Sequence, residues 1–241
     1  MLPQRDLSES VCVVFDILRA TTSMMMALSN GAEGIIPVGE IAEAIACREK
    51  NPGILLAGER DGLRINAEQS GSVDFDFGNS PREFPTEKVQ GKTIAMTTTN
   101  GTRALQACAG AKTILIGSFL NLRPLANWIT ERIPENLILV CSGTHEQAAL
   151  EDTLAAGALC EKIWVHYVGG SVADSAEIAR RIYPLMQMDL MGAMNHSKNG
   201  RRLLANPALR SDVGFCLQRE TLNFIAQCKD GVVRKLKQNS A

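Results

Sequence analysis

Short apolar runs alternate along this chain with longer segments in which apolar residues recur at helical spacing. Each run has the length of a strand and is rich in branched residues, which favour β-structure. Since the runs are apolar throughout, they predict strands that other layers cover on both faces of a sheet. The predicted strands span 11–15, 34–38, 54–57, 93–96, 113–117 and 137–141.

Helices are predicted between and after these strands. Gly31 and Gly110 stand directly after two of the helical segments, where glycine commonly ends a helix. The alternation of strands and helices implies a layered α/β/α fold with a largely parallel or mixed sheet. The predicted helices span 22–30, 41–50, 102–109, 122–132 and 150–164.

Two stretches depart from this alternation. Residues 58–90 contain few apolar runs and several glycines and prolines, so a long loop or a small insertion is expected there. The residues after 172 look more helical and more polar. We therefore predict an α/β core over 1–171, which carries the functional loops, and a C-terminal lobe over 172–241. The lobe is either separate or a part of the same single domain.

Composition and charge narrow the class of protein. The 241 residues are 45% hydrophobic and 21% charged, as in ordinary globular proteins. The formal net charge of -1 and the lack of a basic stripe in the sequence argue against a nucleic-acid partner. The small basic cluster of Arg234, Lys235 and Lys237 is interpreted as a solvated tail.

The chain carries no sequence signal for a membrane or for secretion. No apolar run approaches the roughly 20 residues that a membrane-spanning helix needs, and the polar N-terminal stretch lacks the apolar centre of a signal peptide. A cytoplasmic protein without a membrane partner is expected.

The seven cysteines are widely spaced and odd in number, so reduced thiols are expected rather than disulfides or a zinc site.

Polar residues gather directly after several predicted strands. In open α/β sheets, ligands bind beyond the carboxyl ends of the strands, where loops lead into helices. Small hydroxyl side chains, glycines, backbone N–H groups and helix N-termini recur in these loops, and such groups suit an anion such as phosphate. The loops are 16–22, 58–60, 97–103 and 142–144.

Charged side chains share or adjoin these loops. Arginines provide forked donors that match phosphate or carboxylate oxygens. Carboxylates beside them would repel an anionic ligand unless a cation lay between, and Mg²⁺ is typically held by one or two carboxylates together with phosphate oxygens. The residues therefore favour a Mg²⁺ site for a phosphorylated ligand. The arginines are Arg19, Arg60 and Arg103, and the carboxylates are Asp16, Glu59, Glu151 and Asp152.

Each feature also has a purely structural interpretation. Asn100 could serve only as a helix cap, Glu151 and Asp152 as charges at a helix N-terminus, and a lone arginine as a surface ion-pair partner. Neither the P-loop motif nor a GxGxxG motif occurs in the sequence. Recurrence of the same chemistry after several strands is what favours a binding site.

Several of these segments together resemble one family, the 2-phosphosulfolactate phosphatases of coenzyme M biosynthesis, often called the ComB family. The strings TTTNGTR at 97–103 and GNSP at 78–81 are the most specific part of the resemblance, which extends over nearly the whole chain. The similar segments are 16–22, 58–60, 77–81, 97–103, 118–121, 141–144 and 151–157, followed by Ser197, Gly200, Leu203 and 212–216.

The resemblance implies a Mg²⁺-dependent hydrolase that releases inorganic phosphate and 3-sulfolactate, with an α/β fold of its own type. The small anionic substrate of that family carries a phosphate, a carboxylate and a sulfonate, which explains the number of anion-binding loops. The expected metal ligands are Asp16, Glu59 and Glu151. The expected catalytic residues are Asp16, Arg19, Asn100 and Asp152. The expected substrate-binding residues are Thr21, Arg60, Asn79, Ser80, Thr98, Thr99, Gly101, Thr102, Ser142 and Gly143.

Two other functions fit part of the pattern. A non-catalytic protein that binds a phosphometabolite would keep the N–H groups and arginines but would not need the carboxylates. A metal-dependent lyase acting on a phosphorylated acid would need both but would release no inorganic phosphate. The presence of all four carboxylates favours an enzyme over a binding protein, and product analysis separates a phosphatase from a lyase. The sequence leaves open whether water or a carboxylate attacks phosphorus, and whether the chain forms a homo-oligomer.

Overall fold

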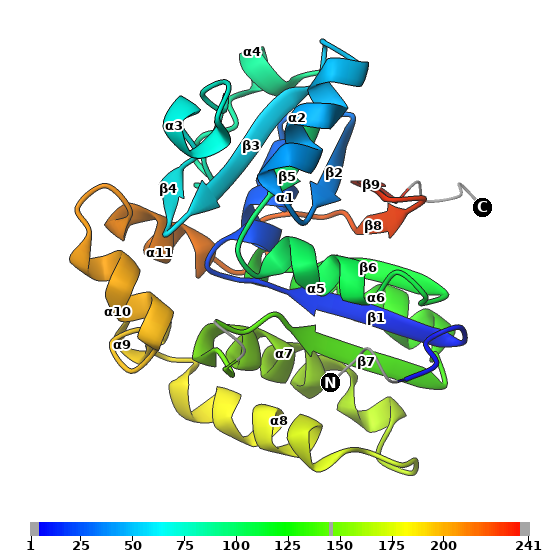
Figure 1. Ribbon diagram of the computed structural model, residues 1–241. Coiled ribbons are helices and arrows are strands. Elements are labelled where there is room, and N and C mark those ends of the chain that lie inside the picture. The colour runs from blue at the N-terminus through cyan, green and yellow to red at the C-terminus, as the bar shows by residue number, and fades with distance from the viewer. Residues whose placement is uncertain (1–4, 145–146, 237–241) are drawn as a thin grey trace.

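Nine strands form a single mixed sheet in the part of the chain that the computed structural model describes, residues 5–144 and 147–236 (Figure 1). Their order across the sheet is β4-β3-β5-β2-β9-β8-β6-β1-β7. All six strands predicted from the apolar runs are present, and the layered α/β prediction is confirmed. The strands are β1 (Ser10–Phe15), β2 (Gly34–Val38), β3 (Leu55–Arg60), β4 (Leu63–Arg64), β5 (Thr93–Thr97), β6 (Thr113–Gly117), β7 (Asn136–Cys141), β8 (Ala226–Lys229) and β9 (Val232–Lys235).

The sheet consists of two parallel halves that a hairpin joins. Strands β3, β5 and β2 run parallel to one another, and so do β6, β1 and β7. The hairpin of β8 and β9 lies between the halves and pairs antiparallel with β2 on one side and with β6 on the other. Figure 1 shows the arrowheads of β1, β7 and β3 directed toward the same side of the molecule. The loops that leave both halves can therefore meet there.

The hairpin corrects the expectation for the C-terminal residues. No strand is predicted after residue 172, yet Asp230 and Gly231 form a two-residue turn in which both have positive φ, 50° and 73°. An Asp-Gly pair suits such a turn because glycine and aspartate tolerate this backbone conformation. Arg234 and Lys235 lie in β9 rather than in a solvated tail, while Lys237 lies outside the described residues.

Helices cover both faces of the sheet. Helix α1 is buried along most of its length, and Met24 and Met25 on it are fully buried. Helix α7 packs on β7, β1 and α6, and α8 in turn covers α7. The helices of the predicted core are α1 (Ala20–Ser29), α2 (Ile41–Lys50), α5 (Gly101–Ala107), α6 (Leu122–Arg132) and α7 (Leu150–Ile163).

The stretch 58–90 is more ordered than the expected long loop. It holds β4 and two short helices, α3 (Ala67–Ser70) and α4 (Thr86–Val89). Ile65 and Phe75 are buried in a small core beneath it, because Phe75 donates its backbone N–H to the carbonyl of Ile65 and so folds the segment back on itself.

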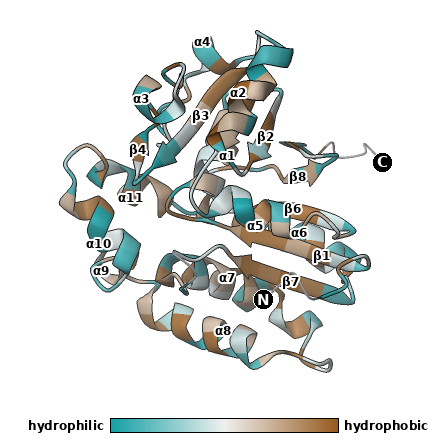
Figure 2. Ribbon diagram, viewed as in Figure 1, coloured by the Kyte–Doolittle hydropathy of each residue, from teal (hydrophilic) through white to brown (hydrophobic). Residues whose placement is uncertain are grey.

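Helices α8 (Asp174–Met186), α9 (Leu190–Ala193), α10 (Lys198–Ala205) and α11 (Arg210–Cys216) form the predominantly helical C-terminal part. Leu203 and Val213 on α10 and α11 belong to the same buried cluster as Ile17 and Leu154. Figure 2 shows hydrophobic colour along β1 and β7. Strand β1 is buried throughout, as predicted, whereas β7 at the edge of the sheet is mostly half-buried. None of the helices in the described part of the chain has the length and apolar character needed to span a bilayer.

Candidate active site

The loops that follow β1, β3 and β5 meet at one polar cavity of about 30 Å³. Its remaining walls come from Asn79, which lies between α3 and α4, from the loop after β7 and from α10. This volume has room for one or two water-sized groups, so a larger ligand must extend beyond it. The structure brings seven of the residues expected from the sequence to this cavity. They are Asp16, Arg19, Glu59, Asn79, Thr98, Thr99 and Asn100.

Asp16 stands directly after β1 and is buried. Its Oδ1 accepts the backbone N–H of Ala20, 3.1 Å away, at the start of α1. The pKa of Asp16 is raised to about 6, chiefly by burial and in smaller part by the charges of Glu59 and Glu151, against hydrogen bonds that lower it. A carboxylate in this environment is stabilised by a cation, because a positive charge offsets both the burial and the neighbouring negative charges.

Glu59 lies at the end of β3 and reaches the loop after β5. Its Oε1 accepts the backbone N–H and the hydroxyl of Thr99, both at 2.9 Å, and its Oε2 accepts the N–H of Gly62 at 2.7 Å. Glu59 therefore fixes the loop after β5 relative to β3 while it lines the cavity. These contacts hold Thr99 beside the carboxylates, where its backbone and hydroxyl are already committed to Glu59.

Gly101 permits the loop after β5 to approach Asp16. A Cβ placed on Gly101 would lie 2.6 Å from Oδ2 of Asp16 and 2.6 Å from Cβ of Ala20. Neither neighbour can move far, because both are buried between α1 and α5. Gly101 was expected to bind substrate, but it is not part of the cavity lining. Its lack of a side chain instead sets the distance between the loop after β5 and the loop after β1.

We expect Gly101→Ala to lower kcat about a hundredfold, since a displacement of about 1 Å in an active site costs that much, and to cost about 1–3 kcal/mol of stability through overpacking. Phosphate release and denaturant unfolding measure the two effects. Gly214→Ala is the matched control, because a Cβ on Gly214 in α11 meets nothing within 4 Å. Normal turnover by Gly101→Ala would contradict the close approach.

Asp152, expected to be catalytic, lies behind the cavity rather than in its wall. Its Oδ1 accepts the N–H of Ile17 at 2.8 Å, and its Oδ2 accepts the hydroxyl of Ser142 and the N–H of Gly143, both at 3.1 Å. Burial raises the pKa of Asp152 well above its usual range, and the charge of Asp16 adds to this. Asp152 thus connects the loop after β1 to the loop after β7. Ser142 and Gly143, which were expected to donate hydrogen bonds to an anionic ligand, donate to Asp152 instead.

Glu151, expected as a metal ligand, faces α10. Its Oε2 accepts the hydroxyl of Ser197 at 2.5 Å and its Oε1 accepts the amide of Asn199 at 3.3 Å. Ser197 is also the N-cap of α10 and accepts the N–H of Gly200. Glu151 therefore connects α7 to the N-terminus of α10.

The structure corrects the expected three-carboxylate metal set. Among the described residues, no group of three His, Cys, Asp or Glu side chains is close enough to hold a metal ion. Asp16 and Glu59 remain as the expected carboxylates that line the cavity. Two carboxylates still fit Mg²⁺, which keeps waters or substrate oxygens as its other ligands.

Asn79 strengthens the fit to a cation. Its Oδ1 is buried without a hydrogen-bond partner among the described residues, and the side chain lines the cavity. A buried polar oxygen costs free energy unless something binds it, and amide oxygens are ligands that hard cations accept. The backbone of Asn79 is held in place, since its carbonyl accepts the hydroxyl of Ser23 at 2.7 Å.

Asn100 also keeps its side chain available. It precedes α5 as the N-cap residue, yet its side chain makes no capping hydrogen bond. Asn100 therefore occupies the N-cap position without capping α5 through its side chain, and it lines the cavity.

The remaining expected residues serve the loops rather than the cavity. The Arg60 guanidinium donates to the carbonyl of Glu59 and to the hydroxyl of Thr97, and Arg60 does not line the cavity. The hydroxyls of Thr21 and Thr102 bond the backbone within their own loops. Ser80 donates its hydroxyl to Asp212 at 2.7 Å.

Asp212 holds Arg19 from outside the cavity. Arg19 donates to Oδ2 of Asp212 at 2.7 Å and to the carbonyl of Gly62 at 2.6 Å. Oδ1 of Asp212 accepts from Ser80 and from Arg82. Asp212 is fully buried, so Arg19 reaches the cavity with its charge already paired.

Five cavity residues were not expected from the sequence. Leu18 and Thr144 lie in the loops 16–22 and 142–144, which the strand-end pattern did indicate. Asp61 follows β3, and the other two lie on α10, in the polar C-terminal part where no such pattern points to a site. The sequence marks Asn199 and Arg202 only as polar residues on one face of α10, which by itself does not indicate a binding site. The five are Leu18, Asp61, Thr144, Asn199 and Arg202.

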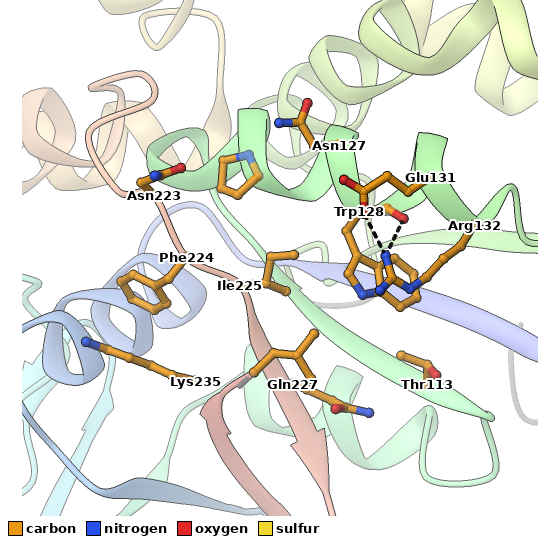
Figure 3. Close-up of a pocket in the computed structure, with 12 residues that line it drawn as sticks. Thr113, Asn127, Trp128, Glu131, Arg132, Asn223, Phe224, Ile225, Gln227 and Lys235 are labelled. Carbon is orange, nitrogen blue, oxygen red and sulfur yellow. Dashed lines mark hydrogen bonds and ion pairs between the residues drawn. The ribbon is translucent and has the colours of Figure 1, made fainter. Parts of the chain in front are cut away.

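A larger groove of about 850 Å³ lies elsewhere, between α6 and β8 (Figure 3). Thr113, at the amino end of β6, is part of its lining, so the groove lies away from the carboxyl ends of the parallel strands. Its cations are already engaged: Arg132 stacks on Trp128 and bonds Glu131, and Lys235 lies over Phe224. The groove has a single carboxylate in its lining, Glu131, and therefore lacks the paired carboxylates of the smaller cavity.

Comparisons with known proteins identify similar chains. A family model described as 2-phosphosulpholactate phosphatase matches residues 1–231. The chain is 35% identical to a probable 2-phosphosulfolactate phosphatase of Caldicellulosiruptor saccharolyticus, over 95% of this chain and 93% of the relative. It is 37% identical to a relative of the same description from Caldanaerobacter subterraneus subsp. tengcongensis, over 95% and 92% of the two chains. A third, from Thermotoga maritima, is 35% identical over 96% and 95%.

Proposed function

Because this chain belongs to the 2-phosphosulpholactate phosphatase family, whose members are phosphoric monoester hydrolases, we propose that it hydrolyses 2-phospho-3-sulfolactate to 3-sulfolactate and inorganic phosphate with the help of Mg²⁺. The observation that carries the proposal is the pair of buried carboxylates, Asp16 and Glu59, in a cavity that also contains the unpartnered Oδ1 of Asn79. A binding protein for an anion would have no use for this negative charge.

Asp16 and Glu59 would hold the metal, with Asn79 as a neutral oxygen ligand. A bound Mg²⁺ would neutralise charge on the phosphoryl oxygens and lower the barrier to displacement of the leaving group. The raised pKa of Asp16 fits this role, since a cation would favour its ionised form. Glu59 keeps its orientation through three hydrogen bonds, from Thr99 and Gly62.

The polar groups around the carboxylates would orient the phosphate. Asn100 has a side chain that no capping bond occupies, and Thr98 lines the cavity beside it. In phosphoryl transfer most of the rate comes from positioning and from charge stabilisation, so fixed donors of this kind suffice. Hydrolysis breaks the bond between phosphorus and the C2 oxygen, adds the hydroxyl of water to phosphorus, and returns the proton to the leaving oxygen.

Two positioning residues, Asp152 and Glu151, fix the segments around the cavity relative to one another. Asp152 binds loops from β1 and β7, and Glu151 binds the N-terminus of α10. Neither carboxylate lines the cavity itself, so both act through the geometry of Asp16 and Asn199. This arrangement would keep the site from relaxing when the charged substrate enters.

Phosphate release with and without a chelator tests the proposal. We expect wild-type protein to release inorganic phosphate from 2-phosphosulfolactate, to lose at least about tenfold in rate after extensive chelation, and to recover on addition of Mg²⁺. Product analysis by mass spectrometry should find 3-sulfolactate in equal amount. Turnover of substrate without inorganic phosphate would instead indicate a lyase, and an undiminished rate in the chelated protein would remove the metal from the proposal.

A further inference from the structure

Arg202 is a cation of the cavity wall that comes from the C-terminal part of the chain. It lies on α10, and its Nε and one terminal nitrogen both donate to Oδ1 of Asn199, at 3.2 and 2.9 Å. The amide of Asn199 donates in turn to the carbonyl of Leu18 at 2.7 Å. These hydrogen bonds therefore position the guanidinium relative to the loop after β1, which begins with Asp16 and lines the same cavity.

The two arginines of the cavity differ in how their charge is balanced. Arg19 is 3% exposed and pairs with the buried carboxylate of Asp212. Arg202 is exposed, and within the described part of the chain it forms no ion pair; its partner there is the neutral oxygen of Asn199. Of the two guanidinium groups, Arg202 is thus the one whose charge is not compensated.

Gly62 brings the two guanidinium groups toward one point. A Cβ placed on Gly62 would lie 3.6 Å from a terminal nitrogen of Arg202 and 3.8 Å from one of Arg19. Gly62 has a φ of 83°, a conformation that glycine adopts without steric penalty, and a Cβ there would also lie 3.2 Å from Cδ1 of Leu209. Since Arg19 is paired with Asp212, Arg202 is the guanidinium beside this point that can attract an anion.

We propose that Arg202 binds the sulfonate of the substrate and thereby selects phosphorylated acids that carry a second strong acid group. This inference rests on the proposed function. The phosphate and the carboxylate are attached to the same carbon, whereas the sulfonate stands one methylene further out. The cavity of about 30 Å³ is too small for the whole substrate, so the outermost group would reach the exposed part of its wall, where Asp61 and Arg202 lie and Arg202 is the cation. A sulfonate offers three oxygens to the forked N–H donors of the guanidinium.

Paired substrates and paired variants test this inference. Arg202→Gln removes the charge, and Arg201→Gln is the matched control, because the neighbouring Arg201 is exposed and bonds only the carbonyl of Asn195. We expect Arg202→Gln to lower kcat/KM for 2-phosphosulfolactate by about tenfold to a hundredfold, as for one lost charged contact. The value for 2-phospholactate, which lacks the sulfonate, should change less than about twofold. Arg202→Lys should restore part of the loss.

An equal loss on both substrates would overturn the inference, because Arg202 would then act on the phosphate, the carboxylate or the fold. An unchanged value on both would overturn it as well. Calorimetric titration with 3-sulfolactate reads the same contact without turnover: binding should weaken in Arg202→Gln and not in Arg201→Gln. If wild-type protein releases no phosphate from 2-phosphosulfolactate, the proposed function fails. The titration still tests whether Arg202 binds the sulfonate. Equal binding of 3-sulfolactate by both variants, or no binding by the wild type, would overturn that inference.

Discussion

Replacing Asp16 with asparagine is expected to lower kcat for phosphate release by about a hundredfold to a thousandfold, the usual cost of one preorganised electrostatic group. Asparagine keeps the shape and can still accept the N–H of Ala20 through its oxygen, but it removes the negative charge that would hold Mg²⁺. Steady-state kinetics at saturating Mg²⁺ measure the effect. Asp189→Asn is the matched control, because Asp189 also accepts a backbone N–H at a helix start, that of Gly192, but on the surface.

The same substitution should stabilise the metal-free protein. Burial raises the pKa of Asp16 from 3.8 to about 6, so ionisation of this carboxyl opposes folding. The penalty is absent below the unfolded pKa and complete above the folded pKa. Asp16→Asn should therefore gain up to about 3 kcal/mol over wild type near pH 8 and little near pH 4. Denaturant unfolding in a chelator measures this. A variant that lost both turnover and stability near pH 8 would show that Asp16 is needed for the fold instead.

Asp212→Ala is expected to cost about 3–5 kcal/mol of unfolding free energy, because it leaves the guanidinium of Arg19 buried without its charge partner. Asp212 is fully buried and accepts hydrogen bonds from Arg19, Ser80 and Arg82. Denaturant unfolding at neutral pH measures the loss. Turnover should fall as well, since Arg19 would no longer be held at the cavity.

Glu177→Ala is the control for this loss. Glu177 also pairs with two arginines, Arg180 and Arg181, but at the surface of α8. Exposed ion pairs typically contribute no more than about 1 kcal/mol. If the two variants lost the same small amount of stability, the buried network around Asp212 would not be a determinant of the fold.

The order of strands and helices could be predicted because it depends on local patterns. Continuous apolar runs such as 11–15 and 137–141 need cover on both faces, and the helical segments between them supply it. The same logic located Asp16, Glu59 and Asn100, since each directly follows or ends such a run. Local patterns thus indicate which polar residues stand at the ends of strands.

The C-terminal hairpin shows where local patterns were insufficient. Its strands have four residues each, too short for a clear apolar run, and their place in the middle of the sheet depends on pairing with β2 and β6, which are far away in sequence. An Asp-Gly turn between them was the one local signal. Pairing partners of this kind are chosen by long-range contacts, and a single sequence contains no direct record of them.

The sequence by itself determined which chemistry is present: carboxylates, arginines and small polar residues after parallel strands. Only the tertiary structure decided which of these groups face the ligand. Asp152, Glu151 and Arg60 have the same residue types as the cavity groups, but folding directs their oxygens and nitrogens to Ile17, Ser197 and Thr97. Conversely, α10 brings Arg202 to the cavity from a segment without any strand-end signal. The physical reason is that a buried charged group needs a hydrogen-bond or ion-pair partner close by. Whether that partner is another residue or the substrate depends on distances between residues that are remote in sequence.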